Sequence, residues 1–135
     1  MINLMLVFFS IISTSYVYGF DNVFDLEDLE VGKSVTLPTP ATTVFSATSE
    51  VRLSSTDKSQ IVKIALFDVK VKESIKIAIY DSNSAGVHYV KIDKDMPALY
   101  NFHELSTIQI VPKPIASTSH LKLIVESNKP LGITR

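Results

Sequence analysis

The chain has 135 residues, of which 46% are hydrophobic and 20% are charged, and it carries a formal net charge of −1 with no cysteine. This length suits one compact domain, and the high apolar fraction with low net charge excludes a disordered chain. The lack of cysteine excludes a disulfide framework, a thiolate metal site and a cysteine nucleophile. Near-neutral charge gives no case for nucleic-acid binding.

The first 19 residues carry no charged side chain, and every acidic or basic residue lies at Asp21 or later. Their apolar run, Leu4–Phe9, is too short for a membrane span of about 20 residues, but it is typical of a secretory signal peptide. We therefore expect residues 1–19 to be a signal peptide that is cleaved after Gly19, leaving no stable membrane span. An uncleaved N-terminal anchor is the alternative, because no Lys or Arg precedes the run.

Two absences favour a bacterial envelope or cell surface over an animal extracellular space. The chain has no cysteine and no Asn-x-Ser/Thr acceptor for glycosylation. The predicted location is therefore secreted or periplasmic.

Residues 20–34 form an acidic lead-in segment. All five charged residues before Val31 are acidic, whereas residues 31–135 hold nine acidic and 13 basic residues. Asp21 is a suitable helix cap and Gly32 a suitable end, so we expect a short helical turn or an irregular segment. A solvated acidic segment is the simplest interpretation, and a calcium-binding cluster or an acidic docking strip is the alternative.

From Val35 onward the sequence predicts strands, and residues 35–135 are expected to form a single domain. The expected strands cover residues 35–37, 42–48, 51–53, 61–71, 75–80, 87–92, 108–111, 121–125 and 131–133. Residues 98–105 are ambiguous, because Leu99, Phe102 and Leu105 have helical spacing. Strands at this spacing, without a long amphipathic helix, indicate an all-β sandwich of about seven to nine short strands. The pattern is similar to that of small immunoglobulin-like or jelly-roll domains of exported bacterial proteins.

The strand expected over residues 61–71 changes phase in its middle. Leu66 and Phe67 are adjacent and both apolar, and the alternation reverses after them. The pattern predicts either a β-bulge or a crossing from one sheet to the other at this point.

The best-specified local structure is a hairpin around the loop 81–86. Pairing Tyr80 with Val87 puts Ile75 opposite Ile92, Ile77 opposite Val90 and Ile79 opposite His88, all on one face. A slip of one residue would mix apolar and polar side chains on both faces, so the alternation itself predicts the register.

The other face of this hairpin carries the candidate binding residues Tyr80, Tyr89, Lys76 and Lys91. Exposed aromatic rings stack on sugar rings or anchor protein contacts. The alternative is that another strand or loop covers this face, which would make both tyrosines part of the core. Lysines beside tyrosines also suit single-stranded nucleic acid, but predicted secretion and the near-neutral charge argue against such a partner.

Catalytic and metal-binding patterns are weak. With glycine after residue 19 only at Gly32, Gly86 and Gly132, the sequence lacks a phosphate-binding loop, a dinucleotide fingerprint and a nucleophile elbow. The three histidines, His88, His103 and His120, have no metal-ligand spacing. Asp81-x-Asn83-x-x-Gly86 resembles a fragment of a calcium loop, but the same residues are typical of a hairpin turn.

The sequence therefore predicts no catalytic residue, no metal site and no cofactor. It favours a secreted or periplasmic, non-catalytic binding or structural module that contacts a protein partner, such as an accessory subunit of a bacterial surface assembly. A carbohydrate-binding module that uses Tyr80 and Tyr89 is the alternative. A small secreted hydrolase built on His103 and Glu104 is a third hypothesis.

Overall fold

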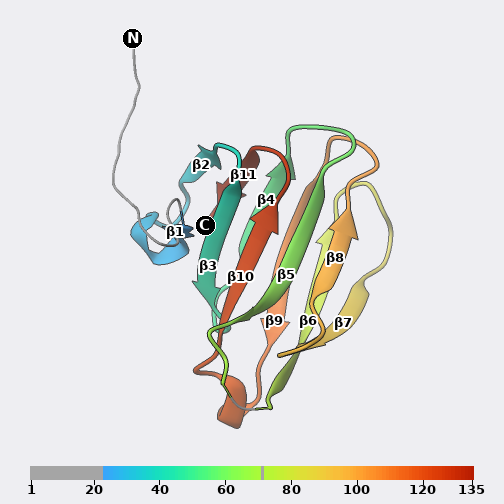
Figure 1. The fold of residues 1–135 in the computed structure, drawn as a ribbon. Helices are drawn as coiled ribbons and strands as arrows, with labels where there is room; N and C mark the ends of the chain where they lie inside the picture. Colours follow the sequence, from blue (N-terminus) through green and yellow to red (C-terminus); the bar gives the residue numbers. More distant parts are fainter. Residues whose placement is uncertain (1–22, 71) are drawn as a thin grey trace.

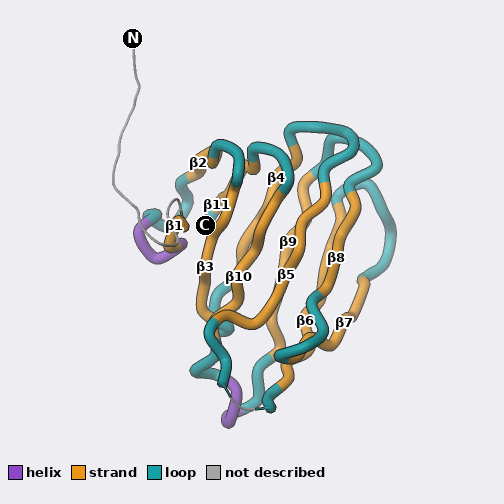
Figure 2. Tube along the Cα trace, in the orientation of Figure 1, coloured by secondary structure: helices purple, strands orange, loops and turns teal. Residues whose placement is uncertain are grey.

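A computed structural model describes residues 23–70 and 72–135. Sheet A contains, in spatial order, β1 (Val23–Asp25), β3 (Ala41–Ser46), β10 (Lys122–Ser127), β5 (Ile61–Phe67) and β8 (Ala98–Asn101). Sheet B contains β2 (Ser34–Leu37), β11 (Leu131–Thr134), β4 (Val51–Ser55), β9 (Thr107–Lys113), β6 (Ser74–Asp81) and β7 (His88–Asp93). The two sheets form two layers (Figure 1), joined by loops at both ends (Figure 2). The predicted signal peptide, residues 1–19, lies outside the described residues.

The core lies between the two sheets. Strand alternation turns Phe45, Ile64 and Leu123 of sheet A inward, where they are at most 1% exposed. Leu53, Ile77 and Ile108 of sheet B face them and are fully buried. Burying a side chain of this size stabilises a fold by about 1.5–3 kcal/mol. With no disulfide available, this apolar layer holds the two sheets together.

One buried polar side chain, Gln60, ties three loops together at one end of the sandwich. Its Oε1 accepts a hydrogen bond from the Thr56 backbone N–H at 2.7 Å, and its Nε2 donates to Ser127 Oγ at 2.7 Å and to the Pro130 carbonyl at 3.0 Å. Its backbone carbonyl accepts a hydrogen bond from the N–H of Phe102. A fully buried amide is stable here because each of its polar atoms has a partner.

The prediction of an all-β protein is confirmed, but the predicted number of strands is too low. The described residues contain eleven strands in two sheets, and the two that the sequence missed are β1 and β8. In β8, the helical spacing was misleading, because Ala98 pairs with Ile64 and Leu99 with Lys63 in an antiparallel ladder. Leu99 points outward and is 70% exposed, whereas Phe102 is buried just beyond the strand.

Part of the predicted acidic lead-in, residues 20–34, contributes to the sandwich. β1 pairs in parallel with β3, and the short 3-10 helix η1 (Leu26–Asp28) follows it directly. A helical turn was expected here, but Asp25 rather than Asp21 caps it, because its carboxylate accepts a hydrogen bond from the Glu27 backbone N–H. Leu26 is buried in the core, so this turn is anchored by an apolar side chain.

The phase change at Leu66 and Phe67 marks a crossing between sheets. β5 ends at Phe67 in sheet A, four residues short of the predicted end, and Asp68 adopts a positive φ of 52°. The chain then enters sheet B as β6. The apolar alternation before Phe67 thus belongs to β5, and the alternation after it belongs to the loop that follows this strand.

Candidate functional site

The hairpin of β6 and β7 holds the four predicted site residues on the outer face of sheet B. The predicted register is confirmed, because Ile75 lies opposite Ile92 and Ile77 opposite Val90. The intervening residues therefore point outward: Lys76 lies directly opposite Lys91, and Ala78 lies opposite Tyr89. Tyr80 lies on the same face as Lys76, four residues further along β6.

β9 extends this face by a third strand. In the β6–β9 ladder, Lys113 lies opposite Lys76 and Val111 lies opposite Ala78. The outer face therefore carries a lysine row, Lys91–Lys76–Lys113, and beside it an apolar row, Tyr89–Ala78–Val111. Two of the three lysines were predicted from the sequence, whereas Lys113 was missed because the predicted strand ended at Val111.

The strand β9 continues through Pro112 for a structural reason. Proline cannot donate to a ladder, but β4, the neighbour on the other side of β9, begins at Val51 opposite Ile110. No β4 residue therefore needs the missing N–H of Pro112. Ile108, Ile110 and Pro112 alternate along β9 and are all buried, so Lys113 points outward. This alternation is a signal that the sequence contained.

The outer face of sheet B is open at the hairpin. Tyr89 is 61% exposed and Tyr80 is 37% exposed, and the three lysines are all exposed. The alternative prediction, that another strand or loop covers this face and makes both tyrosines part of the core, is therefore wrong. An exposed tyrosine with a cationic neighbour is a common element of binding surfaces.

The lysine row places like charges next to each other. Neighbouring strands lie about 4.8 Å apart, so the backbone of each lysine lies roughly that distance from the backbone of the next. Among the described residues, an ion pair joins Lys129 to Asp57 at 4.0 Å, His120 Nε2 lies 3.6 Å from a Glu73 carboxylate oxygen, and neither contact involves the row. Like charges directly opposite each other destabilise a sheet, so this arrangement costs stability.

On the inner side of the same hairpin, Tyr100 of β8 links sheet A to sheet B. Its hydroxyl donates a hydrogen bond to the Asp81 carboxylate at the end of β6, and its ring packs edge-on against Phe102 with 5.4 Å between ring centroids. Burial, with the added effect of the Asp81 hydrogen bond, raises the pKa of Tyr100 to about 12. His88, predicted at the rim of the inner face, is exposed and packs edge-on against Tyr100 at 6.5 Å.

The loop after β6 is a turn in which the acidic side chain caps the backbone. Asp81 accepts a hydrogen bond from the Asn83 backbone N–H at 2.8 Å in addition to that from Tyr100. The Asn83 side-chain amide donates to the Leu105 carbonyl, and Gly86 adopts a positive φ of 90°. These contacts support the turn interpretation of the Asp81-x-Asn83 pattern.

The other residues singled out in the sequence do not gather into one site. His103 and Glu104 are exposed in the loop after β8. His120 lies elsewhere, next to Glu73, which comes just before β6 in the chain. Within residues 23–70 and 72–135, no group of three His, Asp or Glu side chains converges on a point where a metal ion would bind. In the same residues, no helix is long and apolar enough to span a membrane.

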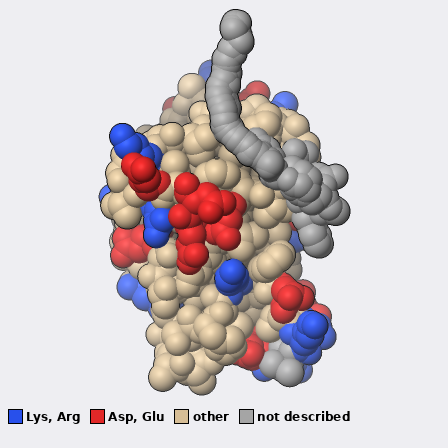
Figure 3. Space-filling view, turned by 90° about the vertical axis from the view of Figure 1, so that its left-hand side faces the viewer, with Lys and Arg blue, Asp and Glu red and all other residues tan. Residues whose placement is uncertain are grey.

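The part of the acidic lead-in that the structure describes, from Val23 onward, lies on the opposite side of the molecule from the hairpin (Figure 1). Figure 3 views the side that carries β1 and η1, and acidic side chains gather there beside basic ones. Glu27 and Asp28 are exposed on η1. The Arg135 guanidinium donates hydrogen bonds to the carbonyls of Glu27 and Leu29, which fixes the C-terminal residue against this turn.

Comparison of the chain with protein-family models, with curated proteins and with solved structures gives no match.

Proposed function

We propose that this chain is an exported, non-catalytic binding module whose partner contacts the outer face of sheet B at the β6–β7 hairpin. The observation that carries the proposal is that the lysine row and the exposed ring of Tyr89 lie side by side on an uncovered sheet face. The β6–β7 and β6–β9 ladders fix the backbone positions of these residues before binding, which lowers the entropic cost of forming a contact. A protein partner is favoured, as in an accessory subunit of a surface assembly.

A carbohydrate partner is the second candidate, because the ring of Tyr89 is exposed on a flat sheet. Sugar hydroxyls also need free polar side chains that donate or accept hydrogen bonds. The nearest amide on this face, that of Gln109 opposite Tyr80, already donates to Glu50 at 2.8 Å. This arrangement favours a protein over a sugar.

The strand order supports a jelly roll as the form of the sandwich, rather than an immunoglobulin-like one. From β3 to β10, the order is 3-10-5-8 in one sheet and 4-9-6-7 in the other. Consecutive strands therefore change sheet at every connection except the β6–β7 hairpin, as two Greek keys folded together require.

Export rests on the uncharged N-terminal sequence and the lack of cysteine. N-terminal sequencing of the mature protein tests this part of the proposal. We expect Phe20 as the first residue, and a mature chain that still begins at Met1 would contradict export by cleavage.

Site-specific photo-crosslinking tests the binding face. A photoreactive phenylalanine analogue replaces Tyr89 in one variant and Leu99, which is 70% exposed on the outer face of sheet A, in a matched control. We expect one discrete protein adduct from position 89 and none from position 99. Equal labelling from both positions, or none from either, would contradict the proposal. Retention on a polysaccharide that is lost in Tyr89→Ala would instead favour the carbohydrate candidate.

A further inference from the structure

The lysine row is the strongest departure from ordinary sheet chemistry in the described residues. On an exposed sheet face, oppositely charged residues usually face each other across strands, because like charges repel. Lys76 has a lysine on both sides, Lys91 on β7 and Lys113 on β9. Positions that break a local rule at a cost in stability are often functional, since the cost must be offset elsewhere. An anionic partner would offset it.

Of the two rows beside the lysines on this face, one holds Ser74 opposite Asp93, and the other is apolar and limits the kind of anion that can bind. Tyr89 and Val111 flank Ala78, which is fully buried beneath its neighbours although it points to the outer face. A partner that covers both rows must therefore place carboxylates over one row and apolar groups over the other. Protein segments that combine acidic and apolar side chains meet this requirement, whereas a sugar ring of an acidic polysaccharide stacks on Tyr89 but offers hydroxyl groups to the rest of the apolar row.

We infer that the lysine row binds an acidic segment of a partner protein, with apolar side chains of that segment against Tyr89 and Val111. This inference rests on the proposed function and adds the chemical class of the partner. The three lysines act here as separate point charges. Electrostatic attraction therefore steers the partner toward this face, and binding weakens as the salt concentration rises. The partner is recognised by the pattern of acidic and apolar groups together.

Binding of a labelled peptide that repeats Glu-Glu-Phe four times tests this inference on the full mature chain. Fluorescence anisotropy measures the Kd at low salt and at moderate salt. We expect binding to weaken about 10-fold between about 50 mM and 300 mM NaCl, because screening weakens exposed charge contacts. The row variant, with Lys76→Gln, Lys91→Gln and Lys113→Gln, is expected to bind about 10-fold or more weakly than the parent at low salt.

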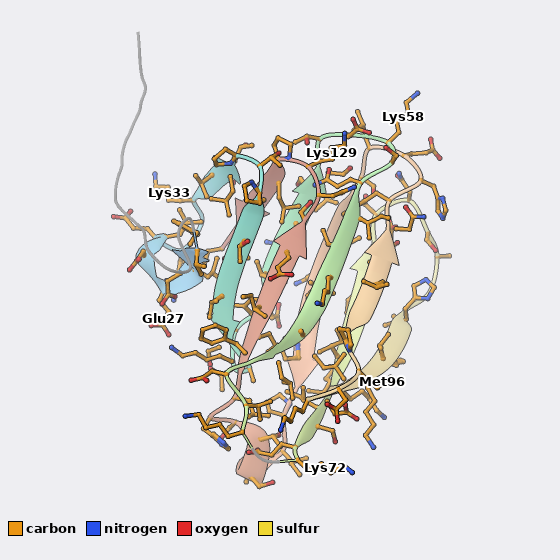
Figure 4. All side chains as sticks on the ribbon, in the orientation of Figure 1. Glu27, Lys33, Lys58, Lys72, Met96 and Lys129 are labelled. Atoms are coloured by element: carbon orange, nitrogen blue, oxygen red, sulfur yellow. The ribbon has the colours of Figure 1, made fainter. Side chains whose placement is uncertain are left out.

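A control variant removes the same number of charges elsewhere. Lys33→Gln, Lys58→Gln and Lys129→Gln change the net charge equally, and Figure 4 labels Lys58 and Lys129 at the end of the sandwich opposite Lys72. The ion pair of Lys129 with Asp57 is exposed, so its loss changes the stability little. This variant is expected to keep the parent Kd within about twofold at the moderate salt concentration, where overall charge alone contributes little.

Three results would overturn the inference. They are no peptide binding by the parent, equal loss in the row and control variants, and tighter binding of a polygalacturonate oligomer than of the peptide. Folding of each variant is checked by its urea unfolding curve. Crosslinking from position 89 separates this test from that of the proposed function. If the adduct forms equally in the row variant, the binding face stands and the acidic partner is wrong; if no adduct forms in the parent, the proposed function itself fails.

Discussion

The outer faces of the two sheets differ in how charged residues are paired across strands. On sheet A, Lys63 of β5 lies directly opposite Glu126 of β10, so unlike charges face each other. On sheet B, Lys76 lies between Lys91 and Lys113, so three like charges stand in one row. Both sets are exposed on antiparallel strands, and burial does not explain the difference. We propose that the face of sheet A serves the fold, whereas the face of sheet B bears a cost in stability that binding of a partner offsets.

The two faces can be compared only if the two sheets keep one fixed arrangement, and the buried Gln60 side chain helps to hold it. Gln60→Leu leaves the Thr56 N–H without the carbonyl that accepts its hydrogen bond, and removes the bonds to Ser127 and Pro130. We expect a loss of about 2–4 kcal/mol in the free energy of unfolding, because buried polar groups lose their partners. Urea unfolding measures this change.

The same exchange at Gln109 is the control for Gln60. Gln109 is partly exposed, and its amide bonds only to Glu50 at the surface. Gln109→Leu is expected to change the free energy of unfolding by less than about 1 kcal/mol. Equal effects at the two positions would show that the buried network at Gln60 does not hold the loops.

Charge exchange on the two faces is expected to act with opposite signs. Glu126→Lys puts two lysines opposite each other on sheet A and should lower the free energy of unfolding by about 0.5–1 kcal/mol. Lys76→Glu puts a carboxylate between two lysines on sheet B and should raise it by a similar amount. Changes of the same sign in both variants, measured by urea unfolding at low salt, would contradict the comparison.

The smallest expected effect is a change in the free energy of unfolding at alkaline pH. Tyr100 has its pKa raised from 10.0 to about 12 in the folded chain, so the unfolded chain releases this proton first as the pH rises. The stability that comes from the hydrogen bond to Asp81 is therefore present below about pH 10 and is lost as the pH rises through about 12. Tyr100→Phe should remove this component. Thermal unfolding of both chains at pH 8 to 11.5 measures the difference, and parallel curves would contradict it.

Local patterns predicted some parts of the molecule well. The hairpin register followed from alternation on both sides of one loop, because a single slip exposes the isoleucines of β6. The positions of Tyr89 and Lys91 on the open face followed from the same register. These features depend on residues that are close in the sequence, so the sequence contains enough information to place them.

Long-range pairing could not be read in the same way. Lys113 joins the row only because β9 pairs with β6, which lies more than thirty residues earlier in the chain. β1 was missed because its short apolar run is followed by acidic residues, and its pairing with β3 supplies the missing stabilisation. Two partners of the Gln60 amide, Ser127 and Pro130, lie 67 and 70 residues away in the sequence, so no local pattern predicts these hydrogen bonds.

The most direct test of the central claim is the free energy of unfolding of the parent and of Lys76→Gln at low and at high salt. Removing the central charge of the row relieves repulsion, so the variant is expected to be more stable by about 0.2–1 kcal/mol at low salt. The difference should shrink at about 1 M NaCl, where screening acts over about 3 Å. A variant that is less stable than the parent at low salt would show that the lysine row serves the fold, and it would contradict the account.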